Sequence, residues 1–466
     1  MSVPADLVLR GVAVVDTRSG AVERAMSVSI AGGRITAISA GGAACGAEVV
    51  DADGLYVVPG FLDMHCHPLD SSDPQGALAL MLANGVTGFR QMSGAPHLLE
   101  RRGELAAAGT AVPELLGMPG TILTRVNAPT PDAAVEEVRR QKAQGADFIK
   151  VIDVAPDAFF AALDEAKAQD LPFVGHLPPS VPVVAAARAG MRSIEHLGPR
   201  DAVCLGCSHD ETTLRAAIAA MPAPPPMPPS GSEALRLLRR ALVNPVVFTS
   251  PAEFARYDRV VSTYSDERCE RLAADFIADG TWQVPTLIRL RTMAFGDDPR
   301  YAGDPNLSFV PSETRSLWAE IGEQFSRMPP EARRSIQALY AVQVRMVGAF
   351  HRAGVKMMAG SDQGGGWIVP GFGLHQEFDL LAEAGLSPLA VLQMATLNAA
   401  PFLRREDRMG TVEVGRDANL VLLDGDPTGS TANLHRIAAV VRGGRYFPQQ
   451  ALAAMKRRVE ERCAAA

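Results

Sequence analysis

Two histidines separated by one residue follow an apolar segment, and their spacing suits a metal ion. The segment, residues 57–64, reads Val-Val-Pro-Gly-Phe-Leu-Asp-Met and leads into His65, Cys66 and His67. Alternate side chains of a β-strand point the same way, so both imidazoles project to one side of the strand end. Imidazole is a common zinc ligand. The pair alone is weak evidence, because most neighbouring histidines on a strand bind no metal.

Later apolar segments end in further residues that can bind or bridge metal ions. These residues are Lys150, His176, His196 and Asp362. Helical stretches such as 131–145 and 156–169 lie between the segments. Strand, helix and strand at this spacing predict parallel βαβ units.

Eight segments of the chain qualify as parallel strands. They are residues 61–67, 86–91, 114–118, 148–152, 172–177, 193–197, 283–288 and 355–361. This pattern predicts an α/β fold, a (β/α)8 TIM barrel over residues 59–409. Active sites of this barrel lie at the C-terminal ends of the strands, and every candidate ligand lies at such an end. The positions of these residues at strand ends and their ability to bind metal are therefore two independent indications of the same site.

The two ends of the chain share a different pattern. Residues 1–58 and 410–447 consist of short alternating apolar segments separated by glycine turns. We expect both ends to combine into one small β-sandwich domain beside the barrel. Residues 448–466 are charged and predict a C-terminal helix.

Two insertions interrupt the barrel pattern, at residues 199–280 and 289–345. Insertions after barrel strands lie over the catalytic face, so we expect them to cover the site and select the substrate. The first contains a proline-rich run, 221–229, that is too rich in proline for a helix or a central strand. That run is expected to form a surface turn or a mobile connection.

Composition excludes several classes of function. The net charge is −7 without a basic tract, which argues against nucleic acid as a partner. No run of about 18 apolar residues predicts a membrane helix. The first ten residues lack the pattern of a secretory signal, and the six cysteines are scattered, so we expect a cytoplasmic protein with reduced thiols. The expected partner is a small-molecule substrate, and assembly into a homo-oligomer is left open.

Lys150 is conspicuous because the chain has five lysines against forty arginines. A buried amine can lose its proton and react with CO2, whereas a guanidinium stays protonated. A lysine in a core salt bridge is the equally simple alternative.

Together these residues resemble the amidohydrolase superfamily. The resemblance includes residues 59–67 (Pro-Gly-Phe-Leu-Asp-Met-His-Cys-His) and 410–424, and it extends to about residue 447. Residues 374–386 are similar to the prolidase-like and imidazolonepropionase-like branch. The resemblance implies two divalent metal ions, usually zinc, bridged by a carbamate on Lys150. An imidazolonepropionase-type site with one metal lacks this lysine.

Carried over by motif, the resemblance assigns one metal to His65, His67 and Asp362, and the more exposed metal to His176 and His196. The two ions would activate a hydroxide and polarise the carbonyl of the substrate. Asp362 would carry the proton from this hydroxide to the leaving group.

Substrate contacts are less well defined by the sequence. Arg289 and Arg291 follow the seventh predicted strand and suit a substrate carboxylate. Asp63 either orients a histidine or shapes the strand end. The full set of candidate substrate contacts is His97, Arg289, Arg291, Tyr264 and His375.

The function expected from these residues is metal-dependent hydrolysis of an amide bond in a peptide-like or N-acyl amino acid substrate. Hydrolysis of a cyclic amide, carbamate or urea on the same centre is the alternative. A non-catalytic scaffold is a more remote alternative, because all six ligand positions hold competent residues.

Overall fold

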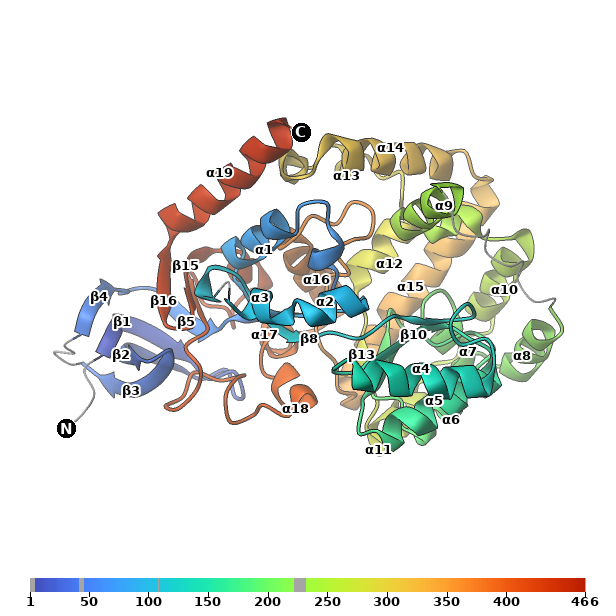
Figure 1. Cartoon of the computed structure of the whole chain (residues 1–466), viewed down its shortest axis with the longest axis horizontal. Helices are drawn as coiled ribbons and strands as arrows, with labels where there is room; N and C mark the ends of the chain where they lie inside the picture. The colour runs from blue at the N-terminus through green and yellow to red at the C-terminus, as the bar shows by residue number, and fades with distance from the viewer. Residues whose placement is uncertain (1–4, 42–45, 108, 222–231, 466) are drawn as a thin grey trace.

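The computed structural model describes residues 5–41, 46–107, 109–221 and 232–465. Apart from Met221, the proline-rich run 221–229 lies outside these residues. A strand-rich domain that contains the N-terminus lies beside a larger α/β body (Figure 1). Among the described residues, no helix is both long and apolar enough to cross a membrane.

Seven parallel strands of the larger body follow the predicted segments, with small differences at their ends. They are β6 (Phe61–Cys66), β7 (Val86–Gln91), β8 (Glu114–Gly117), β10 (Ile149–Asp153), β11 (Phe173–Gly175), β12 (Ser193–Glu195) and β13 (Trp282–Val284). A two-residue strand that the sequence did not predict, β9 (Leu123–Thr124), pairs with β10. The α/β barrel is confirmed.

The eighth predicted strand, 355–361, is not a regular strand. It closes the barrel through isolated contacts: Met357 forms a single parallel bridge with Gln283, and the Met64 amide donates to the Ala359 carbonyl at 3.0 Å. Gly360 lies directly against His65, where a Cβ atom would come within 2.8 Å of the His65 Cβ. This close approach leaves no room for a larger residue.

The seventh strand is also shorter than the prediction of 283–288. It ends at Val284, because Pro285 has no amide hydrogen for a ladder and Thr286 takes a left-handed φ of 44°. The chain then enters helix α12 (Leu287–Ala294), so Arg289 and Arg291 lie on a helix instead of a strand end.

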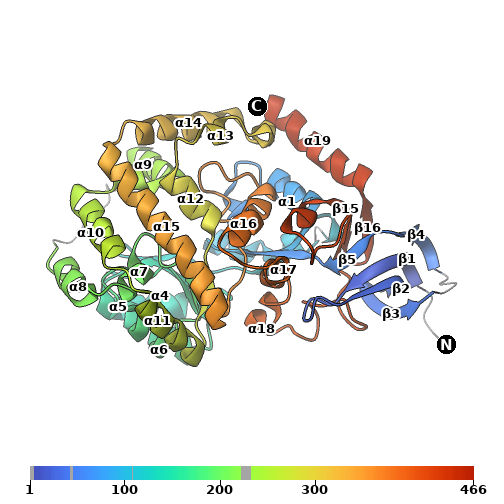
Figure 2. The same cartoon turned by 180° about the vertical axis from the view of Figure 1, so that it is seen from behind.

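The two insertions are largely helical in the described residues. The first contains α7 (Ala202–Gly206), α8 (Glu211–Ala219), α9 (Ser232–Val243), α10 (Pro251–Ser262) and α11 (Asp266–Asp279). The second contains α12, α13 (Pro299–Ala302), the short 3-10 helix η4 (Pro305–Phe309), α14 (Ser312–Ser326) and α15 (Pro330–Ala353). Helices α9, α12, α14 and α15 occupy the end of the barrel domain remote from the N-terminal strands (Figure 2).

The two ends of the chain come together, as predicted, and their strands form one mixed β-sheet. Its strands are β1 (Ala5–Val15), β2 (Val22–Ala31), β3 (Arg34–Ala40), β4 (Gly46–Asp51), β5 (Tyr56–Pro59), β14 (Leu420–Leu423), β15 (Ile437–Arg442) and β16 (Arg445–Pro448). The long strand β1 pairs with β4 along its first half and with β5 near its end, so the sheet branches there. Side chains from both chain ends fill its apolar core.

The C-terminal helix α19 (Gln449–Ala465) returns to the barrel domain. Leu452 and Met455 pack against Leu82 at the end of helix α1 (Pro74–Ala83), and Val459 packs with Leu80. The end of the chain is therefore placed beside α1, the first α-helix after β6 (Figure 1).

Candidate active site

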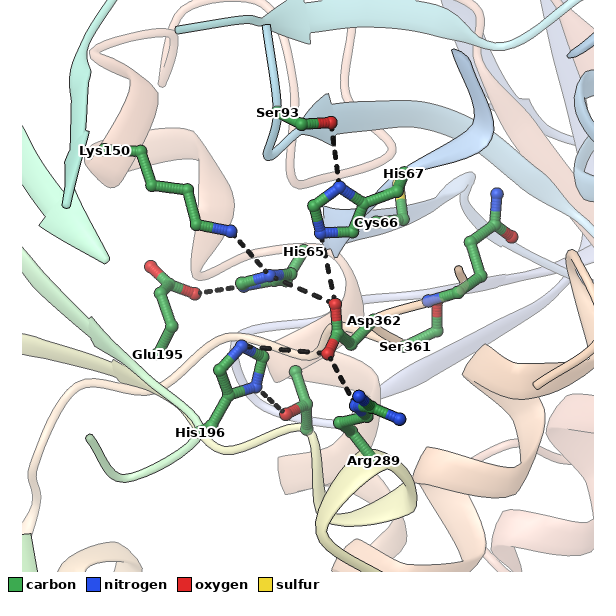
Figure 3. Close-up of polar contacts among 12 residues, drawn as sticks. His65, Cys66, His67, Ser93, Lys150, Glu195, His196, Arg289, Ser361 and Asp362 are labelled. Carbon is green, nitrogen blue, oxygen red and sulfur yellow. Dashed lines mark hydrogen bonds and ion pairs between the residues drawn. The ribbon is translucent and has the colours of Figure 1, made fainter. Parts of the chain in front are cut away.

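The strand ends bring three metal-binding side chains into one cluster. His65 ends β6, His196 follows β12, and Asp362 follows the irregular eighth segment. One donor atom from each of these residues lies within 4.8 Å of the others, and all three residues are buried. Figure 3 shows the side chains converging on Asp362.

The Asp362 carboxylate is the centre of this cluster. Its Oδ1 atom lies 3.4 Å from Nε2 of His65 and 3.2 Å from Nε2 of His67. Its Oδ2 atom lies 3.8 Å from Nε2 of His196. Three imidazoles thus present the same nitrogen to one carboxylate.

The backbone around the cluster is held in unusual conformations. Asp362 has a φ of 51°, His196 of 57°, Leu197 of 54° and Thr286 of 44°. Each left-handed residue other than glycine costs about 1–3 kcal/mol and persists only where the surroundings enforce it. The concentration of such residues at these strand ends indicates a site that the fold holds in place.

Buried hydrogen bonds fix the ring nitrogens of His65 and His196. Nδ1 of His65 lies 2.7 Å from Oε2 of Glu195, a carboxylate that can only accept. Nδ1 of His196 lies 2.5 Å from Oγ1 of Thr286, whose hydroxyl donates to the Pro285 carbonyl at 2.8 Å. Both Nδ1 atoms therefore carry the hydrogen, and both Nε2 lone pairs face Asp362.

His67 is oriented in the same way. Its Nδ1 lies 2.9 Å from Oγ of Ser93, and this hydroxyl also contacts the Asp70 carboxylate. Ser93 therefore donates to Asp70 and accepts from His67. Three imidazole lone pairs and one carboxylate form a donor set that fits zinc, with hydrogen-bonding partners behind each ring.

Burial sets the protonation of three of the imidazoles in the form that a metal requires. It lowers the pKa values of His65, His176 and His196, so these rings are neutral. Burial alone would also lower the pKa of His67, but its hydrogen bonds with Asp362 and Asp70 raise it. Burial alone would raise the pKa of Asp362, but the surrounding imidazoles hold it well below its ordinary range. Asp362 is therefore a carboxylate.

Lys150 is buried at the edge of the same cluster. Its Nζ atom lies 3.3 Å from Nε2 of His65 (Figure 3). Burial lowers the pKa of this amine to about 8, so about one tenth of it is neutral at pH 7. The neutral amine is the form that reacts with CO2.

His176 lies on the other side of His196. It follows β11, it is half-buried, and its ring centroid is 5.1 Å from that of His196. All six residues proposed from the sequence as ligands are thus neighbours in space. Polar contacts within 4 Å join five of them: three imidazoles contact Asp362, and Lys150 contacts His65.

The residues behind His65 were missed at the sequence level. Glu195 receives hydrogen bonds from Arg90 Nη2 at 2.8 Å and from Ser193 Oγ at 2.6 Å. Burial would raise the pKa of Glu195, but Arg90 and His65 hold it at about 2. The available signal was an acidic residue inside the buried strand Ser193–Glu195, because a charge there requires a partner.

Asp63 connects β6 to the eighth barrel segment through hydrogen bonds, none of which involves an imidazole ring. Its carboxylate accepts from the Ser361 amide at 3.0 Å, from Ser361 Oγ at 2.6 Å and from the His65 amide at 3.2 Å. Burial raises its pKa to about 7. Asp63 therefore fixes the backbone on both sides of the ligands.

Of the proposed substrate contacts, the structure places only Arg289 at the cluster. Its Nε atom lies 3.3 Å from Oδ2 of Asp362. Arg291 on the same helix instead contacts the Tyr301 hydroxyl at 2.5 Å and Asp298 at 3.0 Å. Alternate positions of a helix diverge by about 200°, which explains why two arginines expected to act together face different ways.

The other three candidates lie elsewhere. His97 is exposed on the short helix α2 (Pro96–Glu100). His375 is buried in helix α16 (Phe372–Glu383), where its Nε2 donates to the Asn84 carbonyl at 2.8 Å. Tyr264 packs under Arg345, whose guanidinium carbon lies 5.2 Å from the centre of the ring. None of the three is among the described residues that line the cavity beside the ligand cluster.

A cavity of about 420 Å³ opens beside the cluster. His67, Arg289 and Asp362 line one end of it, and residues of α1, α9, α14 and α19 line the rest. This volume is in the range of small-molecule sites, about 300–1,000 Å³.

Known proteins share this architecture. A sequence model described as "Amidohydrolase family" matches residues 56–447. A solved bottromycin amidohydrolase superposes with a TM-score of 0.70 at 23% identity, covering 98% of this chain and 90% of that one. A Xaa-Pro dipeptidase with bound methionine gives a TM-score of 0.64 at 18% identity, covering 95% and 99% of the two chains. At these identities the likeness concerns the fold.

Curated sequences match only in part. An adenine deaminase from Rubrobacter xylanophilus is 33% identical over 164 residues, which is 32% of this chain and 27% of that enzyme. The chain thus spans about a quarter of the length of this relative. The family match is much longer and includes every residue of the ligand cluster. The chain therefore belongs to the amidohydrolase family.

Proposed function

We propose that this protein is a metal-dependent hydrolase that cleaves a carbon–nitrogen bond, an amide, in a small-molecule substrate. One observation carries the proposal. The Nδ1 atoms of His65, His67 and His196 each donate a hydrogen bond to a protein oxygen. The Nε2 atoms of all three rings face the Asp362 carboxylate. A structural histidine cluster has no need of three lone pairs aimed at one anion, whereas a cation between them satisfies all of the groups.

The proposed ligand assignment uses two divalent metals, of which zinc suits the donors best. His65, His67 and Asp362 would hold one ion, and His176 and His196 the other. Lys150, as its carbamate, would bridge them, and its low pKa and its position beside His65 support this role. When bound, the metals supply a water of lowered pKa and a Lewis acid for the carbonyl oxygen.

Asp362 is proposed to move the proton of the reaction. As a carboxylate at one end of the cavity, it accepts the proton of the attacking water on one carboxylate oxygen and delivers it to the leaving nitrogen. Arg289 fixes the orientation of this carboxylate through its contact with Oδ2.

The substrate class proposed first is a peptide-like amide or an N-acyl amino acid. The names of two structural neighbours, an amidohydrolase and a Xaa-Pro dipeptidase, support an amide. Cyclic amides, carbamates and ureas are the alternative on the same centre. Hydrolytic deamination of a purine is a second candidate, favoured by the partial match to adenine deaminases.

A turnover assay tests this proposal. The metal-loaded protein is incubated with dipeptides, N-acyl amino acids, cyclic amides and adenine, before and after treatment with a chelator. We expect release of an amine from at least one amide, loss of this activity with the chelator and recovery with zinc. Release of ammonia from adenine alone would favour the deaminase, and no metal-dependent turnover of any compound would refute the proposal.

A further inference from the structure

Apolar side chains line much of the cavity beside the ligand cluster, together with charged groups such as Arg239 and Glu313. Its apolar lining comes from segments far apart in the sequence: Leu80 of α1, Leu242 of α9, Phe309 of η4, Leu317 and Trp318 of α14, and Val459 of α19. In Figure 1, α14 and α19 run along the upper edge of the molecule, and α1 and α9 lie beneath them. Both insertions and the C-terminal helix thus contribute to one apolar wall.

Leu242 is the most informative residue of this wall. It is 54% exposed and lines the cavity, so an apolar group bound there would remove its surface from water. Its position is also fixed, because its own carbonyl accepts from Nη2 of Arg289 at 2.6 Å. The same arginine reaches Asp362, so the exposed leucine is tied to the catalytic carboxylate through one side chain.

The arginines that line the cavity are already paired within the protein. Each faces a carboxylate, Arg289 that of Asp362 and Arg239 that of Glu313 at 3.6 Å. Asp70 and Asp73 add further negative charge to the lining. An apolar group bound in this part of the cavity would cover Leu242 and exclude water, and it would leave both ion pairs intact.

We propose that this cavity binds a large apolar group of the substrate, aromatic or branched aliphatic, next to the scissile bond, and that Leu242 selects for it. The inference rests on the proposed amide hydrolysis and names its substrate class. Each methylene buried in such a wall increases binding about three- to four-fold. Amides with a benzyl group should therefore be preferred strongly over their methyl counterparts.

The chain offers a matched control for Leu242. Leu238 lies one turn earlier on α9, is 44% exposed, and is not among the residues that line the cavity in the described part of the chain. Leu242→Ser and Leu238→Ser remove the same side chain from the same helix at similar exposure. Only the first removes apolar surface from the proposed site.

The test separates binding from catalysis. The metal-loaded protein is titrated with 4-phenyl-2-butanone, an uncleavable ketone with the shape of N-benzylacetamide, and with 2-butanone, and binding is followed by calorimetry. We expect the phenyl ketone to bind at least about ten-fold more tightly, Leu242→Ser to lose about five-fold or more of this preference, and Leu238→Ser to keep it. In parallel, kcat/KM for N-benzylacetamide and N-methylacetamide should show the same preference.

Equal binding of the two ketones, or an equal loss in both variants, would overturn the inference. Selective binding of the phenyl ketone without cleavage of any amide would refute the proposed reaction and leave the apolar site standing. Cleavage of small amides with no preference for apolar groups would support the proposed reaction and refute the apolar site.

Discussion

Arg289 and Asp362 connect the ligand cluster to the helix that covers it. Nε of Arg289 lies 3.3 Å from Oδ2 of Asp362, while its Nη1 and Nη2 donate to the carbonyls of Val243 and Leu242 at 2.8 and 2.6 Å. One buried guanidinium therefore joins the end of α9 to the carboxylate at the centre of the site. A cation also suits the C-terminal end of a helix.

Replacing Arg289 should impair catalysis more than metal binding. In Arg289→Met, Asp362 keeps its imidazole neighbours but loses the contact that orients Oδ2, and two carbonyls at the end of α9 lose their donor. We expect kcat/KM to fall about 10- to 100-fold with the metal content unchanged. Arg291→Met is the control, because Arg291 contacts Tyr301 and Asp298 instead. Equal activity of the two variants would contradict this role.

Glu195 should control metal affinity from behind His65. Glu195→Gln keeps the shape of the side chain, but it weakens the charge-assisted hydrogen bond to Nδ1 of His65 and the ion pair with Arg90. Changes of this kind cost about 10- to 100-fold in metal affinity. Competition with a chromophoric chelator measures the affinity directly. Asp63→Asn serves as a comparison, because Asp63 touches only the backbone of His65. A Glu195→Gln variant with wild-type affinity would show that Glu195 has no part in holding the metal.

His375 should make the stability of the protein depend on pH. Burial and the nearby His435 lower its pKa to about 3 in the folded protein, whereas in the unfolded chain it is about 6.5. Between pH 3 and pH 6.5, His375 is therefore protonated in the unfolded chain and neutral in the folded protein. The contribution to stability is therefore complete above pH 6.5 and is lost as the pH falls toward 3, by about 1.4 kcal/mol per pH unit.

Urea unfolding at pH 7 and pH 5 measures this effect. The wild type should lose more stability between the two pH values than His375→Gln, whose amide can still donate to the Asn84 carbonyl. His209→Gln, a change at an exposed histidine, should behave like the wild type. If His375→Gln shows the same loss as the wild type, His375 does not titrate in this way.

The metal ligands proposed at the ends of the barrel strands could be predicted from the sequence. His65 and His67 alternate on one strand, and the other proposed ligands each end a strand, so the barrel brings them together without any knowledge of loops. The union of the two chain ends in one sheet was equally accessible, because both ends show the same alternation and the same glycine turns.

The contacts that depend on tertiary packing could not be predicted. Thr286 reaches His196 only because Pro285 ends β13 early and the next residue turns into the left-handed region. The short spacing of Arg289 and Arg291 suggested a shared role, but the helix that begins at Leu287 separates them. The cavity is lined in part by α1, α9, α14 and α19. These helices are far apart in the sequence, and local sequence patterns do not predict that they pack around one cavity.

The metal content of purified protein, grown with zinc and bicarbonate, tests the central claim most directly. Elemental analysis should give about two equivalents per chain for the wild type, and about one for Lys150→Met, which removes the amine 3.3 Å from His65 while retaining an unbranched side chain. Glu137→Gln, far from the site in helix α4 (Pro131–Ala143), should keep both. Binding of no stoichiometric metal by the wild type would contradict the account, and two equivalents in Lys150→Met would remove the lysine bridge from it.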